Sequence, residues 1–334
     1  MHVFELTRKL IDIESVTPNE REIADFLWRK LHDLAGHFDG AAERMHVEPG
    51  RDNIFVRFGD PVVVLSTHMD TVPPFIPSRE DDYHIWGRGA CDTKGIIAAM
   101  IGAVMQLLEA GHRNFGLLFV VGEERNSAGA LEAARNPRGG KFLINGEPTE
   151  NKLAIGSKGA LRFEIIARGR MAHSAYPELG ESAIEKLLDA LQRIRKLELP
   201  VDSILGRSTL NIGTISGGRA PNVIPDEARA EIFIRAVGDV AGLRTAIAHA
   251  SQPDAEAVEV LFIPPAHLGA LEGFESTVVA FTTDIPAFDG TWGRPFLIGP
   301  GSIHDAHTSE ERISKSQLTE AVDLYQRLVL QLSK

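Results

Sequence analysis

The chain of 334 residues is 43% hydrophobic and 24% charged, which is typical of soluble globular proteins and long enough for two domains. Its formal net charge of −11 argues against nucleic acids and anionic membranes as main partners, because both would repel it. The only cysteine, Cys91, excludes an intrachain disulfide. The chain starts without a basic segment or an apolar leader, so we expect a cytoplasmic protein.

The first part of the chain combines helices with short buried strands. Apolar residues recur at helical spacing over residues 3–13 and 18–34, and Thr17 and Pro18 match the N-cap and first position of the second helix. Short apolar, β-branched runs then predict strands buried on both faces. The strands are predicted at 53–58, 61–65, 115–121 and 142–144, and the helices at 96–110 and 127–134.

Three of these strands are followed directly by side chains that can bind metal ions. One such pair could simply cap a strand, but the repetition is harder to explain that way. Ligands bind beyond the carboxyl ends of strands in α/β sheets, and acidic groups gathered there would repel one another without a cation. The pattern therefore predicts a metal site. Its candidate residues, in chain order, are His68, Asp70, Glu123, Glu124 and Glu147.

A glycine-rich turn at 86–95 opens the helix at 96–110, which is also the outline of a phosphate-binding loop. Its spacing matches neither nucleotide-binding fingerprint, and Asp92 at its centre would repel phosphate. We therefore do not expect a nucleotide site. A second glycine-rich turn, at 299–302, precedes a segment with His304 and His307.

From Gly159 onward the pattern changes to alternating, half-exposed strands, and the order of elements is β-α-β-β-α-β. This order predicts a ferredoxin-like domain over residues 160–264, inserted into a first domain made of 1–159 and 265–334. The strands of the inserted domain are predicted at 160–168, 208–215, 228–236 and 258–262, and its helices at 181–196 and 238–250. The first domain is completed by helices at 271–283 and 317–332 and a strand at 295–298.

Taken together, the motifs resemble the co-catalytic zinc amidohydrolase and carboxypeptidase family that includes acetylornithine deacetylase and succinyl-diaminopimelate desuccinylase. Each motif is weak alone, but their common order along nearly the whole chain is specific. The motifs are His68-Met69-Asp70, the turn from Gly87 to Gly95, Glu123-Glu124, Gly146-Glu147-Pro148-Thr149, and Gly299-Pro300-Gly301-Ser302 with Ala306-His307. The resemblance implies an α/β catalytic domain, with a central mixed sheet flanked by helices, and an inserted α+β lid and dimerisation domain.

The resemblance also implies a centre of two zinc ions per subunit, which cobalt or manganese could replace. His68 and Glu147 would hold one ion, Glu124 and His307 the other, and Asp92 would bridge them.

Two further acids would assist without binding metal. Asp70 would orient the imidazole of His68, and Glu123 would be the general base that takes a proton from the attacking water. His304 is an alternative ligand to His307. Cys91, next to the bridging acid, is interpreted as a small packing residue and not a nucleophile.

In the inserted domain, the resemblance points to three residues that would reach a substrate. His173 would stabilise the oxyanion, often in the site of a partner subunit, while Asn222 and Arg235 would bind the substrate. A guanidinium fork suits a carboxylate, which favours Arg235 for that role. Each residue could instead be an ordinary loop, turn or strand residue.

We therefore expect a metal-dependent hydrolase that cleaves the amide bond of an N-acyl amino acid. The alternative is a metallo-dipeptidase or carboxypeptidase acting on a short peptide. A non-catalytic binding protein on the same scaffold would be expected to lack Glu123 or a ligand, and all are present. A homodimer through the inserted domain is also expected.

Overall fold

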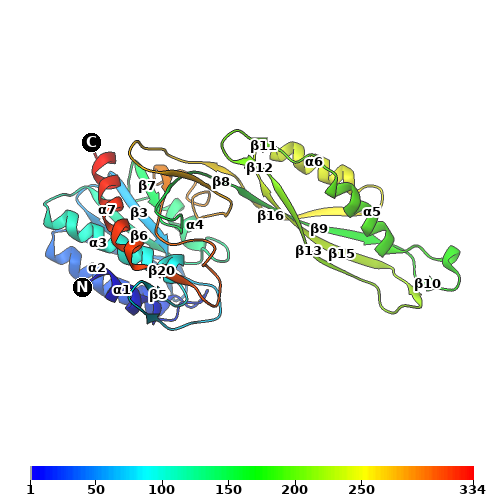
Figure 1. The fold of residues 1–334 in the computed structure, drawn as a ribbon, viewed down its shortest axis with the longest axis horizontal. Helices are drawn as coiled ribbons and strands as arrows, with labels where there is room; N and C mark the ends of the chain where they lie inside the picture. The colour runs from blue at the N-terminus through cyan, green and yellow to red at the C-terminus, as the bar shows by residue number, and fades with distance from the viewer. Residues whose placement is uncertain (1) are drawn as a thin grey trace. The chain divides into compact units, whose positions relative to one another are not determined.

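The computed structural model describes residues 2–334, and the chain forms two compact units. Unit 1 comprises residues 2–155, 268–277 and 283–334, and unit 2 comprises 156–267 and 278–282. Figure 1 shows a sheet flanked by helices in the first unit and helices along a separate sheet in the second. The expected α/β fold with an inserted α+β unit is confirmed.

The main sheet of unit 1 is mixed, and its central strands run parallel. Along it the order is β1-β2-β6-β3-β7-β19-β8-β17, with β18 beside β8. Strand β3 is parallel to both β6 and β7, so the three end at the same edge. The strands are β1 (Ala41–Glu48), β2 (Arg51–Phe58), β3 (Val63–His68), β6 (Phe115–Val120), β7 (Phe142–Asn145), β8 (Leu153–Ser157), β17 (Ala266–His267), β18 (Ser276–Val279) and β19 (Arg294–Leu297).

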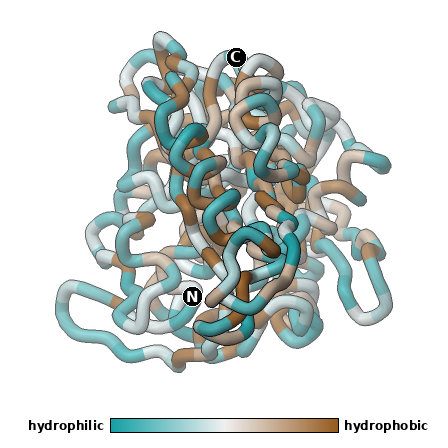
Figure 2. Tube along the Cα trace, turned by 90° about the vertical axis from the view of Figure 1, so that its right-hand side faces the viewer, coloured by the Kyte–Doolittle hydropathy of each residue, from teal (hydrophilic) through white to brown (hydrophobic). Residues whose placement is uncertain are grey.

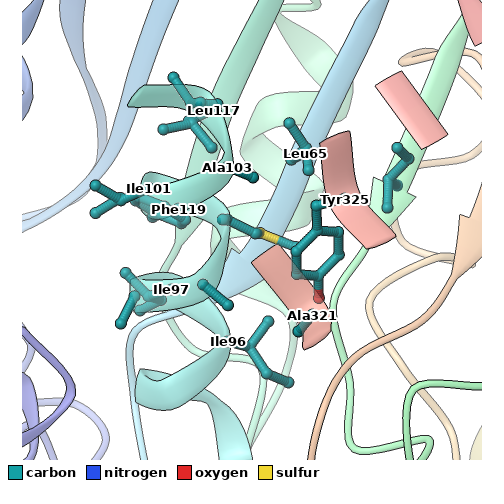
Figure 3. Packing of buried hydrophobic residues seen from close by; sticks show 14 of the residues in the cluster. Leu65, Ile96, Ile97, Ile101, Ala103, Leu117, Phe119, Ala321 and Tyr325 are labelled. Carbon is teal, nitrogen blue, oxygen red and sulfur yellow. The ribbon is translucent and has the colours of Figure 1, made fainter. Parts of the chain in front are cut away.

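Helices cover both faces of this sheet. Successive residues of a strand point to opposite faces, and both sets of side chains are largely apolar and must be buried. Along β6, Leu117 and Phe119 join a core with α1, α2, α3 and α7, whereas Leu118 and Val120 join a smaller core with α4. Figure 3 shows side chains of α3, the central strands and α7 packed together. The helices are α1 (Val3–Ile11), α2 (Arg21–His37), α3 (Gly95–Glu109), α4 (Ala128–Arg135) and α7 (Lys315–Leu332), and a small sheet is formed by β4 (Arg79–Glu80), β5 (His84–Trp86) and β20 (Arg312–Ser314).

Helix α3 is apolar on nearly all sides because it is enclosed by other elements. Small residues allow this close packing: an added Cβ at Gly102 would lie 3.2 Å from a methyl group of Val322 in α7. Within residues 2–334, the segment Ala90–Glu109 alone is long and apolar enough to cross a membrane, and it is mostly buried. It is therefore a core helix of unit 1. Elsewhere, hydrophobic and hydrophilic residues alternate at short intervals along the chain (Figure 2).

Unit 2 is an antiparallel sheet of order β13-β15-β9-β16, with α5 and α6 packed against it. This arrangement confirms the predicted ferredoxin-like order. Its main elements are β9 (Gly159–Arg168), α5 (Ala183–Arg195), β13 (Thr209–Gly217), β15 (Glu227–Ala236), α6 (Val240–Ser251) and β16 (Glu256–Ile263). Its short strands are β10 (Ala172–His173), β11 (Val201–Asp202), β12 (Gly206–Arg207) and β14 (Val223–Ile224).

Two local predictions were wrong. The helix expected at 271–283 is absent, because Gly273 adopts a left-handed conformation (φ 84°) and the β-branched residues after it form β18. Helix α2 begins at Arg21, and Thr17 is not its N-cap. The hydroxyl of Thr17 instead donates to Asp70 Oδ2 at 2.7 Å, so a long-range contact replaces the local cap.

Candidate metal centre

The site lies at the carboxyl edge of the three parallel strands. Register fixes this edge: His68 on β3 lies opposite Val120 on β6, and Ser66 lies opposite Asn145 on β7. Residues that follow these strands therefore emerge side by side. The strands are buried along nearly their whole length, which holds the backbone rigid beneath the polar side chains.

Four of the predicted ligands form a continuous chain of contacts. His68 Nε2 lies 3.0 Å from Asp92 Oδ1, and His307 Nε2 lies 3.2 Å from Asp92 Oδ2. His307 Nε2 also lies 3.1 Å from Glu124 Oε1. Asp92 thus presents one oxygen to each imidazole. This is the arrangement expected of a residue that bridges two ions.

A single ion could be shared by part of this set, since ligand atoms of His68, Asp92 and Glu124 all lie within 4.8 Å of one another. Glu147, the remaining predicted ligand, is only 4% exposed. It follows β7, which pairs with β3 at the same sheet edge, and its charge acts on His68 and Asp92. His304 and His307 are both exposed, but His307 contacts two of the acids, so the geometry favours His307 as the ligand.

Burial disfavours the charged form of the carboxyl groups in this cluster. It raises the pKa of Glu123 and Glu147 well above the ordinary value for a glutamate, and it also raises the pKa of Glu124. Burial alone would raise the pKa of Asp92 too, but hydrogen bonds with His307 and His68 outweigh it and lower that pKa. The partners Asp92 and Glu124 raise the pKa of His307 to about 10.

The donor set fits divalent metal ions. Carboxyl groups outnumber imidazoles, and buried like charges are stable only when a cation compensates them. One further acid, Asp284, is buried with an Oδ1 atom that has no hydrogen-bond partner within residues 2–334. Burial raises its pKa to about 7, and its charge acts on Glu123 and Glu147. Imidazole with carboxylate is a typical zinc donor set.

Asp70 has a broader structural role than the predicted one. Its Oδ1 accepts the backbone N–H groups of Gly122 (2.9 Å) and Glu123 (3.1 Å), and its Oδ2 accepts that of Glu124 (3.2 Å). His68 Nδ1 lies 3.0 Å from the backbone oxygen of Asp70 and 3.5 Å from its Oδ1. Asp70 therefore contacts His68, but its carboxylate mainly holds the turn that carries the two glutamates.

The turn itself requires glycine. Gly122 has φ 83°, and an added Cβ would meet the Arg51 guanidinium at 2.8 Å.

The neighbours of Asp92 in its own turn are also held by contacts. Thr93 donates from its hydroxyl to the backbone oxygen of His68 at 2.6 Å. Cys91 is buried with Sγ 3.7 Å from the backbone oxygen of Ser302, in keeping with packing.

Sequence reasoning missed two acids near this centre, Asp284 and Glu311. Asp284 follows no strand end and belongs to no recognised motif, so nothing in the sequence indicated it. Glu311 lies four residues after His307, in a segment already of interest, and a buried carboxylate there could have been suspected. Its contacts with the Asp92 turn appear only in three dimensions.

The three candidates in unit 2 are not brought together. His173 on β10 lies opposite Val223, and Ser174 N–H donates to the backbone oxygen of Asn222 at 3.0 Å, so His173 and Asn222 share one end of the unit. Arg235 lies opposite Ala160, at the other end of the sheet.

Arg235 is half-buried, unlike the exposed arginines of its unit that also lack an ion pair. Its guanidinium carbon lies 4.8 Å from the ring centroid of Phe233. Within residues 2–334 it forms no ion pair, and burial lowers its pKa without an acidic partner to raise it. It is therefore a desolvated cation available to an anionic ligand.

Comparison with known proteins gives matches along nearly the whole chain. Residues 155–257 match the peptidase dimerisation domain. The chain is 38% identical to a peptidase M20 domain-containing protein of Schizosaccharomyces pombe, covering 98% of this chain and 84% of that protein. It is 36% identical to a probable carboxypeptidase of Aspergillus terreus, covering 96% and 84%. The solved YXEP protein of Bacillus subtilis, a dinuclear metal-binding peptidase, shares the fold, with TM-score 0.72, 15% identity and coverage of 99% and 98%.

Proposed function

Because this chain belongs to the M20 peptidase family, we propose that it is a two-metal carboxypeptidase that releases an amino acid from the carboxyl end of a short peptide. The observation that carries the proposal is the continuous set of contacts through His68, Asp92, His307 and Glu124. Relatives described as probable carboxypeptidases support peptides over the N-acyl amino acids that we first expected.

In the proposed centre, His68 and Glu147 would hold one ion, Glu124 and His307 would hold the other, and Asp92 would bridge them. Zinc suits these ligands, and cobalt or manganese also accepts them. When bound, such ions polarise a substrate carbonyl and increase the acidity of water beside it.

Glu123 is proposed to move the proton. It accepts a proton from the water that attacks the scissile carbonyl carbon, and donates that proton to the nitrogen of the leaving amine as the C–N bond breaks. Two observations support this role. Burial raises the pKa of Glu123, which favours a carboxyl that can hold a proton, and Asp70 fixes its backbone through the hydrogen bond to its N–H.

Arg235 is proposed to bind the free carboxylate of the substrate. The guanidinium has no acidic partner within residues 2–334, and Phe233 restricts its position, so binding a carboxylate would restore the interaction lost on burial. Asn222 is proposed to bind substrate with His173, since the two share one end of unit 2.

His173 is proposed to serve the site of a second subunit. Between Ala160, opposite Arg235, and Arg168, opposite Glu227, strand β9 spans about 26 Å at about 3.3 Å per residue, and β10 lies beyond that end. One small substrate cannot reach both His173 and Arg235 of the same chain. The match to a peptidase dimerisation domain supports a homodimer in which the two come from different chains.

A substrate panel at defined metal content tests the proposed activity. It contains N-blocked dipeptides, free dipeptides and N-acetyl and N-succinyl amino acids, each paired with its carboxyl-terminal amide. We expect cleavage of N-blocked and free peptides, and little or none of the amides, because the amides lack the carboxylate. Cleavage of free dipeptides alone would indicate a dipeptidase. Cleavage of acyl amino acids alone, or of amides at equal rates, would contradict the carboxypeptidase.

A further inference from the structure

The two turns that carry Asp92 and His307 are joined by a buried ion pair that does not belong to the proposed ligand set. Arg88 Nη1 donates to Glu311 Oε2 at 2.6 Å, and the two side chains are 2% and 0% exposed. Arg88 lies four residues before Asp92, and Glu311 lies four residues after His307. The pair therefore connects the segments on either side of the bridging acid.

The second oxygen of Glu311 is directed at the backbone of the bridging acid. The N–H groups of Cys91 and Asp92 both donate to Glu311 Oε1, at 3.3 Å each. The backbone oxygen of Glu311 accepts the N–H of Gly87 at 3.0 Å, at the start of the same turn. Glu311 thus holds the turn at its start, Gly87, and at the proposed metal ligand, Asp92.

Arg88 is in turn fixed from a third segment. Its Nε donates to the backbone oxygen of Pro74 at 3.2 Å, and its backbone N–H donates to the oxygen of Ile76 at 2.9 Å. The guanidinium therefore has partners on both sides and cannot turn away from Glu311 without losing a hydrogen bond. It also compensates a carboxylate that would otherwise repel the nearby Asp92.

Stability alone is a weak reason for such a pair, because an apolar pair of similar volume usually stabilises a protein at least as well. An apolar side chain, however, could not accept the two N–H groups of the Asp92 turn. Asp92 has an imidazole 3.0 Å from one oxygen and 3.2 Å from the other, so a small shift of its backbone would disturb both contacts.

We propose that Glu311, with Arg88 as its counter-ion, is a positioning residue that holds Asp92 in place between the two metal ions. This inference rests on the proposed metal centre. It gives Glu311 the same task for the Asp92 turn that Asp70 performs for the Glu123–Glu124 turn: a buried carboxylate accepts backbone N–H groups and fixes the ligand without binding metal.

The test measures zinc affinity by competition with a chromophoric chelator, beside the thermal unfolding of the metal-free protein. Loss of a group that orients a metal ligand typically weakens metal binding about 10–100-fold, and we expect E311A to fall in this range. E311Q keeps an oxygen that can accept an N–H, so we expect its affinity between those of E311A and wild type.

The matched control is E20A. Glu20 forms another buried ion pair of unit 1, with Arg51, and within residues 2–334 its carboxylate accepts from that side chain alone. Arg51 stays paired with Glu48 in this variant. We expect E20A to lower the unfolding temperature but to bind zinc like wild type.

Wild-type zinc affinity in E311A, or an equal loss of affinity in E20A, would overturn the positioning role. The same holds if E311Q binds no better than E311A. Should E311A fail to fold, E311Q is compared with E20Q, and equal affinity of these two would also overturn it. Failure of the wild type to bind two ions would instead refute the proposed metal centre, so the two failures are distinguishable.

Discussion

The candidate residues of unit 1 and those of unit 2 are organised in opposite ways. In unit 1, acids and imidazoles from distant parts of the chain meet at one sheet edge with contacts of 3.0 to 3.2 Å. In unit 2, His173 and Asn222 lie at the short strand pair of β10 and β14 at one end of the unit, and Arg235 lies at the other end of the four-stranded sheet. The groups proposed to break the bond are therefore assembled within one unit, whereas the groups proposed to recognise the substrate are far apart within the other.

The physical cause of this difference is burial. Strands β3, β6 and β7 are enclosed on both faces, and the buried carboxylate of Asp70 fixes the turn that follows β6. The buried carboxylate of Glu311 fixes the Asp92 turn. The short pairing of β10 with β14 has no such core, and His173 is exposed. A rigid sheet edge suits groups that must keep a fixed geometry, whereas a short exposed strand pair suits a group that must reach elsewhere.

The largest effect is expected from Glu123→Gln in unit 1. The amide keeps the shape of the side chain but cannot accept and return a proton, so kcat should fall about 10²–10⁴-fold. Metal content should not change, because Glu123 is not a proposed ligand. Turnover and bound metal are measured on the same preparation. Retained activity, or loss of metal along with activity, would contradict the assignment.

His173→Ala should lower kcat about 10²–10³-fold if its imidazole stabilises the oxyanion. Mixing this variant with Glu123→Gln tests the subunit from which His173 acts. In a mixed dimer one site would combine an intact Glu123 with His173 of the other chain, so equal mixing should restore about a quarter of wild-type activity. No recovery in dimers shown to exchange subunits would place His173 in its own chain's site.

A smaller effect is expected from Arg235→Lys. Lysine keeps the charge but cannot form the two parallel hydrogen bonds of a guanidinium, which are worth about 1.5–3 kcal/mol to a charged group. The value of kcat/KM for peptides with a free carboxylate should fall about 10–100-fold. Amidated peptides, already poor substrates, should change little. Equal losses for both kinds of peptide would rule out carboxylate binding by Arg235.

The smallest effect is expected from Thr17→Val, which removes the hydroxyl bonded to Asp70 Oδ2. The free energy of unfolding should fall by about 0.5–1.5 kcal/mol, because the buried carboxylate loses one of its donors. Denaturant unfolding measures it. Thr245→Val is the control, since that hydroxyl is exposed on α6 and bonds only to its own helix. Equal results for both variants would show that the Thr17 contact is unimportant.

The sequence predicted most of the candidate metal site at the sheet edge of unit 1, because the patterns that identify its strands and candidate ligands are local. Apolar runs identify the strands, parallel pairing places their ends together, and metal-binding residue types follow them directly. Thr17 was misassigned because its local pattern fits an N-cap equally well, and only folding brings Asp70 to it.

Other features depend on distant contacts that leave no periodic pattern. Glu311 acts through backbone amides that lie more than two hundred positions away along the chain. In unit 2, the separation of His173 from Arg235 follows from strand register, which composition does not reveal. The helix predicted at 271–283 failed because one left-handed glycine and a β-branched run outweighed helical spacing.

The most direct test of the two-metal centre is the metal content of the purified wild-type chain. The protein is stripped with a chelator, loaded with zinc, freed of excess ions by gel filtration and analysed by mass spectrometry of the metal. The proposed ligand set of His68, Asp92, Glu124, Glu147 and His307 predicts two zinc ions per chain, with peptidase activity restored on loading. One ion or none per folded chain would contradict it.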